Sequence, residues 1–168
     1  MADNILLIPA SKVKQQTIIE SNVDDEMIAN ITFQVQEMQL KPVLGKELYD
    51  TLLTEVLNQI EDSNYEIPEQ YQNLLSIYIK PFLLTAITSE FAFVNSYKVT
   101  NKGLLKMNDN SANAVSAAEI ETLRNYYNNQ LSVHKANLIK YLKDNNLTTC
   151  GTDKAITSPA IGWYFDLN

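Results

Sequence analysis

Glycine, cysteine and histidine are scarce in this chain. Its 168 residues hold four widely separated glycines, one cysteine (Cys150) and one histidine (His134). Sites that cradle phosphates or dinucleotides depend on glycine-rich loops, because only glycine lets the backbone approach so closely. A single cysteine excludes an internal disulfide and a cysteine-based metal cluster. These shortages argue against a nucleotide-binding enzyme and favour a structural protein.

The chain also lacks the residue patterns of a catalytic site. Ser96 and Ser158 have no Gly-x-Ser-x-Gly context, the pattern of a nucleophile elbow. His134 falls on the apolar stripe of an expected helix, where a packing role is the commoner one. The carboxylates of residues 24–26 suit the positive end of a helix dipole. We therefore predict that the chain is not an enzyme and has no catalytic, cofactor-binding or metal-binding residue.

Targeting and membrane signals are missing as well. No uninterrupted apolar run approaches the ~18 residues of a membrane span. The first residues, MADNILLIP, lack the basic flank of a signal peptide. We expect a protein made in the cytosol that does not enter a membrane.

Charge is divided unevenly along the chain. Residues 1–75 carry 4 Lys/Arg against 13 Asp/Glu, and residues 76–168 carry 9 against 7, which together give the net charge of −7. Affinity for nucleic acid comes largely from neutralising phosphates with Lys and Arg. An acidic chain of this kind could surround DNA without gripping it, although a solvated acidic face is the simpler interpretation.

Helical periodicity dominates the first half of the sequence. Carboxylates at 24–26 begin a helix that we expect to end before Pro42, and Gly45 opens the next one. Apolar residues recur at helical spacing in both, and each set predicts one buried stripe: Met27, Ile28, Ile31, Val35 and Met38 in the first, and Leu48, Leu52, Val56 and Ile60 in the second.

Two longer helices are expected in the second half. The segment from Pro68 to Val94 is apolar around most of its circumference, and Pro81 should kink or split it near residues 77–80. Ser116 and Glu119 form a capping box that starts the last helix, which Asn145 and Asn146 end.

These elements predict an all-α fold, a bundle of four to five helices led by Asp24, Lys46, Glu69 and Ala117. A long polar connection (98–115) joins the last two helices, and an extended C-terminal arm follows the bundle. We divide the chain into a helical domain (1–147) and a docking arm (148–168).

The connection holds the chain's basic cluster. Lys98, Lys102 and Lys106 are spaced by four among Asn and Ser residues. They could contact DNA phosphates or a neighbouring subunit, but three lysines without interleaved aromatics also suit a solvated loop.

Three consecutive aromatics, Trp163, Tyr164 and Phe165, stand near the end of the arm. Successive side chains of an extended segment point to opposite sides, so the three cannot all face one core. Aromatic residues of this kind are common anchors of protein interfaces. We predict that they bind a partner; the alternative is that the arm folds back along its own bundle beside Pro81.

Two segments carry a family resemblance. Residues 21–26 (SNVDDE), the amphipathic helix after them and residues 40–50 (LKPVLGKELYD) resemble the N-terminal region of head–tail connector proteins of tailed bacteriophages, also called head-completion or adaptor proteins. The later Tyr78–Pro81 helix, the Lys102-Gly103 turn and the helix ending near Tyr141-Leu142 are similar to that family too. Forms from crAss-like and other gut phages are among the proteins that it resembles, and the resemblance covers most of residues 11–146.

The resemblance implies a structural virion protein. Family members are all-helical subunits that form a ring, commonly of twelve copies, beneath the portal protein. That ring extends the DNA channel, touches the genome transiently and without sequence preference, and provides the docking surface for tail or neck proteins. Two alternatives of other classes remain open from sequence: a small cytosolic helical regulatory or scaffolding module, and a DNA-binding protein that uses Lys98, Lys102 and Lys106.

Overall fold

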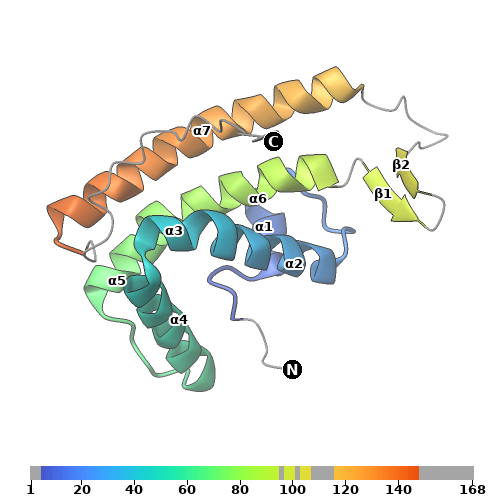
Figure 1. Cartoon of the computed structure of the whole chain (residues 1–168). Helices are drawn as coiled ribbons and strands as arrows, with labels where there is room; N and C mark the ends of the chain where they lie inside the picture. The colour runs from blue at the N-terminus through green and yellow to red at the C-terminus, as the bar shows by residue number, and fades with distance from the viewer. Residues whose placement is uncertain (1–4, 95–96, 101–102, 107–115, 148–168) are drawn as a thin grey trace, which may run out of the picture.

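Helices form nearly all of the regular structure in the chain (Figure 1). The computed structural model describes residues 5–94, 97–100, 103–106 and 116–147. Its elements, in chain order, are α1 (Ala10–Gln16), α2 (Asp25–Val35), the π-helical segment η1 (Gln36–Leu40), α3 (Lys41–Leu44), α4 (Lys46–Glu61), α5 (Glu69–Asn73), the π-helical segment η2 (Leu74–Ile79), α6 (Lys80–Val94), β1 (Tyr97–Thr100), β2 (Gly103–Lys106) and α7 (Ala117–Asp144). The predicted all-α fold is confirmed. A two-stranded hairpin, which the sequence did not indicate, lies within the connection.

The predicted helix starts are confirmed by their caps. Asp24 is the N-cap of α2, where its carboxylate accepts from the Glu26 N–H at 3.1 Å. Ser116 and Glu119 form the capping box of α7, with the Glu119 carboxylate accepting from the Ser116 N–H at 2.8 Å. These side chains satisfy backbone donors that the first helical turn leaves unpaired, and this is why such local signals can be read from sequence.

Neither Pro42 nor Pro81 ends its helix, which corrects the helix end expected before Pro42 and excludes the split that was one of two outcomes expected at Pro81. The helix is nevertheless distorted near residues 77–80, where η2 is π-helical. In both cases a π-helical segment ends just before a Lys-Pro pair, and the lysine N–H donates five residues back: Lys41 to the Gln36 carbonyl, Lys80 to the Leu75 carbonyl. A proline ring clashes with the carbonyl four residues before it. The wider π turn relieves that clash, so the helix continues through the proline.

The η1 segment also changes which residues face the core. Gln36, the first residue of η1, is fully buried one turn after the buried Thr32. One extra residue in the turn rotates the residues that follow, so Leu40 is fully buried whereas Met38 is 72% exposed. The expected burial of Met38 is therefore wrong. The stripe of the preceding helix, Ile28, Ile31 and Val35, is buried as predicted.

Helix α4 leaves the bundle at an angle (Figure 1). It begins at Gly45, whose φ of 79° is a conformation that favours glycine. Leu48, Tyr49 and Leu52 in its first half are buried, but Ile60 near its end is 68% exposed. The predicted apolar stripe thus packs over only half its length.

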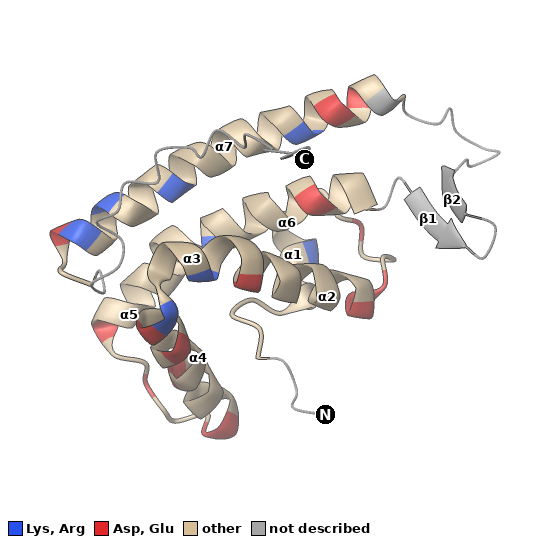
Figure 2. Ribbon diagram, in the orientation of Figure 1, with Lys and Arg blue, Asp and Glu red and all other residues tan. Residues whose placement is uncertain are grey.

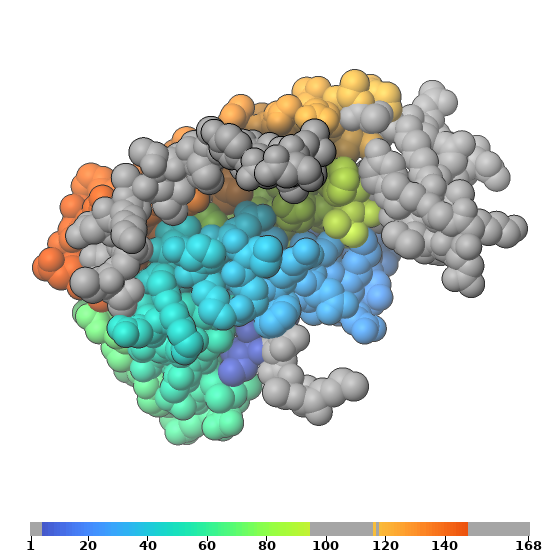
Figure 3. All heavy atoms as spheres, in the orientation of Figure 1, coloured from blue at the N-terminus to red at the C-terminus, as the bar shows by residue number. Residues whose placement is uncertain are grey.

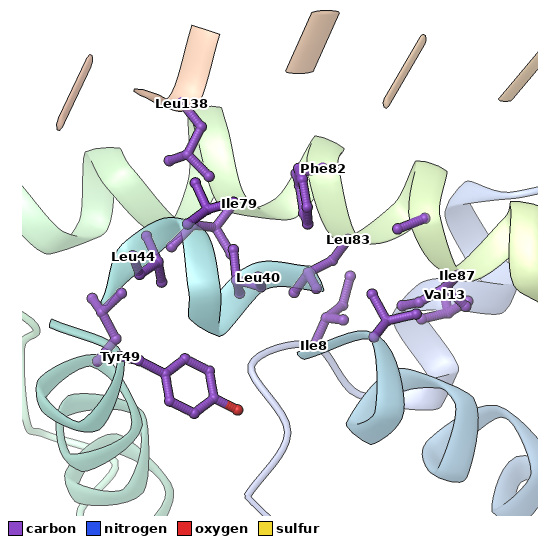
Figure 4. Packing of buried hydrophobic residues seen from close by; sticks show 14 of the residues in the cluster. Ile8, Val13, Leu40, Leu44, Tyr49, Ile79, Phe82, Leu83, Ile87 and Leu138 are labelled. Atoms are coloured by element: carbon purple, nitrogen blue, oxygen red, sulfur yellow. The ribbon is translucent and has the colours of Figure 1, made fainter. Parts of the chain in front are cut away.

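The core lies between α6 and the helices on either side of it. Helices α2 and α3, with η1 between them, cover one side of α6 in the space-filling view, and α7 runs along another (Figure 3). Leu138 of α7 points toward Ile79, and Leu40 and Leu83 meet below (Figure 4). The rings of Tyr78 and Tyr141 stack with their centroids 4.2 Å apart.

Helix α6, together with α5 and η2, forms one continuous helix, Glu69–Val94, of 26 residues. By length and composition alone it could cross a membrane, since its most apolar window has a mean hydropathy of 1.4. Half of that window is buried inside the fold, as expected for the central helix of a bundle. Packing inside the bundle therefore explains why this helix is so apolar.

Candidate interaction surfaces

The predicted basic cluster lies partly in the β-hairpin between α6 and α7. The two strands are antiparallel, and their register pairs Tyr97 with Lys106 and Lys98 with Leu105. The two lysines are therefore on different strands but are not cross-strand partners. Lys102 lies outside the described residues. The hairpin follows the C-terminal end of α6, so this basic segment is at one end of the bundle (Figure 1).

The predicted aromatic anchors, Trp163, Tyr164 and Phe165, lie outside the described residues, as do Cys150, Ser96 and Ser158. The described chain ends at Leu147, just past α7. There Asn146 adopts φ 53°, and the Leu147 N–H donates to the Leu142 carbonyl at 2.9 Å. This arrangement ends the helix at the Asn145-Asn146 pair, as the sequence predicted.

A groove lies between α6, α7 and the segment that joins α1 to α2. It has a volume of about 590 Å³. The lining is mainly apolar and comes from three separate parts of the chain: Ile18 and Val23 from the joining segment, Phe91 and Ala92 from α6, and Ile120 and Leu123 from α7. Sequence reasoning missed this groove. The one local signal was the Ile18-Ile19 pair, which stands outside any helical stripe.

A second cleft, of about 450 Å³, lies beside Pro81 between η2 and α7. His134 lines it with Tyr78, Tyr141 and the ion pair of Lys140 and Asp144, whose Nζ and Oδ2 atoms are 2.6 Å apart. His134 is half-buried against this surface. Among the described residues that line this cleft there is no serine or cysteine.

The carboxylates at the start of α2 have structural partners. Asp24 caps the helix, and Asp25 lies 2.7 Å from the Nζ atom of Lys14 in α1. Within residues 5–94 and 116–147, no group of three or more His, Cys, Asp or Glu side chains is placed to hold a metal ion.

A buried polar network fastens the N-terminal segment to the bundle. The Gln36 side chain is fully buried; its Oε1 accepts from the Leu7 N–H at 2.8 Å, and its Nε2 donates to the Ile5 carbonyl at 3.2 Å and to the Tyr49 hydroxyl at 3.3 Å. One amide thus pairs with two backbone groups two residues apart. Glutamine is needed here because it supplies both a donor and an acceptor.

Burial raises the pKa of Tyr49 to about 12, and the nearby Glu37 carboxylate opposes its ionisation further. In the unfolded chain the pKa of a tyrosine is about 10. Between these two values the unfolded state loses the proton first, so Tyr49 should make the folded state progressively less stable as pH rises from about 10 to about 12.

We expect the tyrosinate absorbance of the folded protein to contain one late step near pH 12 that is missing from Tyr49→Phe. Denaturant titrations at alkaline pH should also show a shallower loss of stability for that variant. If the two titration curves superimpose, the Tyr49 hydroxyl is not buried as described.

Several large apolar side chains remain exposed on the described part of the chain. They occur on η1, α4, η2, α6 and α7 and on the segment after α1: Ile18, Met38, Ile60, Ile77, Phe93, Val94, Leu123, Tyr126 and Val133. Ile18 and Leu123 belong to the groove, and Phe93, Val94 and Tyr126 lie on the neighbouring ends of α6 and α7. Exposed apolar side chains gathered in this way are typical of interaction surfaces.

Residues 40–152 of the chain, about two thirds of its length, match a family of unknown function, DUF6712. The chain belongs to the DUF6712 family. No curated protein and no solved structure matches it.

The DUF6712 match begins at the end of η1 and runs past α7. It therefore includes the hairpin, both long helices and two walls of the groove. The third wall, residues 18–23, and the N-terminal segment held by Gln36 precede the match. In this DUF6712 protein the groove thus combines family elements with residues outside the matched region.

Proposed function

We propose that this chain is a structural virion protein, the adaptor subunit of a ring beneath the portal of a tailed bacteriophage. The ring extends the DNA channel and provides the docking surface for tail or neck proteins. In this role the protein is made in the host cytoplasm and resides at the head–tail interface of the virion. It binds further copies of itself, in a ring of twelve by the resemblance, together with the portal protein.

The observation that carries the proposal is the hairpin at one end of a helical bundle. Both strands lie in the connection between α6 and α7, beyond the C-terminal end of α6 (Figure 1). A short two-stranded hairpin is marginal on its own in water, so contact with another chain would stabilise it. Exposed Phe93, Val94 and Tyr126 lie on the adjoining helix ends and would enlarge such a contact.

The charge distribution suits a channel through which DNA passes. Carboxylates outnumber basic side chains on α4 and at the start of α2, whereas α7 carries Arg124, Lys135, Lys140 and Lys143 against Glu119, Glu121 and Asp144 (Figure 2). Acidic surfaces repel DNA phosphates, so a ring with carboxylates toward its lumen would let DNA slide without holding it. Lys98, Lys102 and Lys106 would then contact the DNA transiently or a neighbouring subunit.

Deleting residues 106–113 should leave the subunit helical and prevent ring formation. The deletion removes the end of β2 and much of the connection but leaves in place every core residue of the described part of the chain. Circular dichroism checks the fold, and light scattering with electron microscopy in the presence of the portal protein checks assembly. If rings form normally from the deleted protein, the connection is only a linker and the proposed contact is wrong.

A matched variant separates the two roles of the lysines. Lys98→Gln, Lys102→Gln and Lys106→Gln together keep the length of the connection and remove its positive charge. Rings that assemble from this variant but retain less DNA would assign the lysines to the channel. Loss of assembly would assign them to the subunit contact. Imaging of the intact virion tests the proposal as a whole, because it shows whether the protein lies beneath the portal.

A further inference from the structure

The groove between α6, α7 and the segment after α1 has a second hollow beside the one of about 590 Å³. This second hollow, of about 250 Å³, is lined by Thr17, Leu84, Thr85, Tyr127 and Gln130. Ile18 and Thr88 line both hollows, so the two lie next to each other along the surface of α6. Together they form a furrow with α6 as its floor.

The furrow has the chemistry of a site for an extended apolar peptide. Ile18, Phe91 and Leu123 offer apolar contacts, and Ile18 is 66% exposed, so it is not used by the subunit's own core. Thr85, Asn22 and Gln130 supply hydrogen-bonding groups along the same path. An extended backbone needs such partners when it leaves water.

The chain itself contains a segment of matching chemistry. Residues 148–168, outside the described residues, include Trp163, Tyr164 and Phe165 with Ile161 just before them. Each of these aromatics could bury about 150–250 Å². The segment carries little charge, with Asp153, Lys154 and Asp166 as its charged side chains.

The length of this segment fits the position of the furrow. Leu123 lies 24 residues before Leu147 on α7, which is about 36 Å at the rise of an α-helix. The 16 residues from Leu147 to Trp163 can span up to about 53 Å when extended. The aromatics can therefore reach the furrow of their own subunit with slack for the turn at Asn146. The cleft beside Pro81 lies about 20 Å from Leu147, at His134, and is therefore also within reach. Its lining includes the ion pair of Lys140 and Asp144, so its chemistry suits apolar aromatics less well than that of the furrow.

We propose that this furrow is the binding site for Trp163, Tyr164 and Phe165 of the same chain. The covalent link raises the effective concentration of the segment to the millimolar range, so modest affinity suffices. Docking also removes three aromatics and Ile18 from water in the free subunit. This inference concerns the subunit before it meets any partner and stands whether or not the proposed function is correct.

Trp163 is the single tryptophan of the chain, so its fluorescence reports directly on this site. In the full-length protein we expect emission shifted to shorter wavelength than in the urea-unfolded chain, with weak quenching by acrylamide. Ile18→Glu and Leu123→Glu, both at partly exposed positions that should tolerate substitution, should shift the emission to longer wavelength and increase quenching. Their circular dichroism should match that of the wild type.

Two matched controls place charges on exposed isoleucines elsewhere. Ile60→Glu at the end of α4 and Ile77→Glu in the cleft beside Pro81 should leave the Trp163 emission unchanged. A shift caused by Ile77→Glu instead of Ile18→Glu would place the aromatics in the cleft and overturn the proposal. Solvent-exposed emission in the wild-type protein would overturn it as well.

Dilution identifies the chain that supplies the aromatics. Intramolecular docking predicts that emission does not change with protein concentration and that the mass measured by light scattering stays that of a monomer. Emission that moves to longer wavelength on dilution, together with dissociation of a larger species, would show that the furrow receives the segment of a second copy. That result would overturn the intramolecular site.

Discussion

Replacing Ile79 with alanine is expected to lower the free energy of unfolding by about 2–5 kcal/mol, the range for truncating a large aliphatic side chain in a packed core. Ile79 is 1% exposed at the end of η2 and points toward Leu138 of α7 (Figure 4). The substitution would leave a cavity between η2, α7 and the Leu40 side chain. Urea denaturation followed by circular dichroism measures the effect.

Ile77 provides the matched control for this substitution. It has the same side chain and lies two residues earlier in the same π-helical segment, but it is 58% exposed. Ile77→Ala should cost less than about 1 kcal/mol, as for most surface substitutions. If the two variants lose the same free energy of unfolding, Ile77 and Ile79 are buried to a similar degree. The helical register described for η2, with Ile79 inside and Ile77 outside, would then be wrong.

Replacing Gln36 with methionine should lower the free energy of unfolding by about 2–4 kcal/mol, because buried polar groups left without partners cost about 1–3 kcal/mol each. Methionine is close to glutamine in size, so packing changes little. The Leu7 N–H and the Ile5 carbonyl would each lose the side-chain partner they have in the structure, and the Tyr49 hydroxyl would lose the Gln36 amide but keep Glu37. Release of the N-terminal segment could restore them to water, and hydrogen exchange at Leu7 would detect that release.

Gln34→Met is the control, because Gln34 is exposed on the same helix. It should change stability by no more than about 0.5 kcal/mol. Combining Gln36→Met with Tyr49→Phe tests the network further. If the two residues are coupled as described, the double variant should cost less than the sum of the single variants.

Local sequence signals predicted the helix starts because the groups that make them are neighbours in the chain. The Asp24 carboxylate reaches the N–H two residues ahead, and Ser116 and Glu119 reach each other across one turn. Gly45 could be placed for a similar reason, since its positive φ is a property of the residue itself. Such features need no knowledge of the rest of the fold.

The two π-helical segments could not be predicted from such local signals. The sequence contained both Lys-Pro pairs, and proline alone predicted a helix end at Pro42 and a kink or split at Pro81. Whether a helix ends at a proline or widens before it depends on what the continued helix gains by packing. Here continuation buries Leu44 and Leu83 in the common core, and that gain is a property of the assembled bundle.

Residues far apart in sequence decide the candidate surfaces. The furrow is lined by the segment around Ile18, by α6 and by the start of α7. These three parts belong to different apolar stripes of the sequence, so no one stripe predicts the furrow. Gln36 is equally hard to anticipate, since its partners lie about thirty residues before it and thirteen after it. A polar residue near an apolar stripe is expected to face water, and only the approach of the N-terminal segment makes its burial favourable.

The sequence by itself determined the all-α class, the helix starts and the identity of most core residues, because capping and 3.6-residue periodicity act over a few residues. The tertiary structure alone decided the passage of helices through Pro42 and Pro81, the exchange of Met38 for Gln36 in the core, the exposure of Ile60 and the presence of the furrow. Each of these depends on contacts between elements, and the energy of such contacts exists only once the elements are packed together.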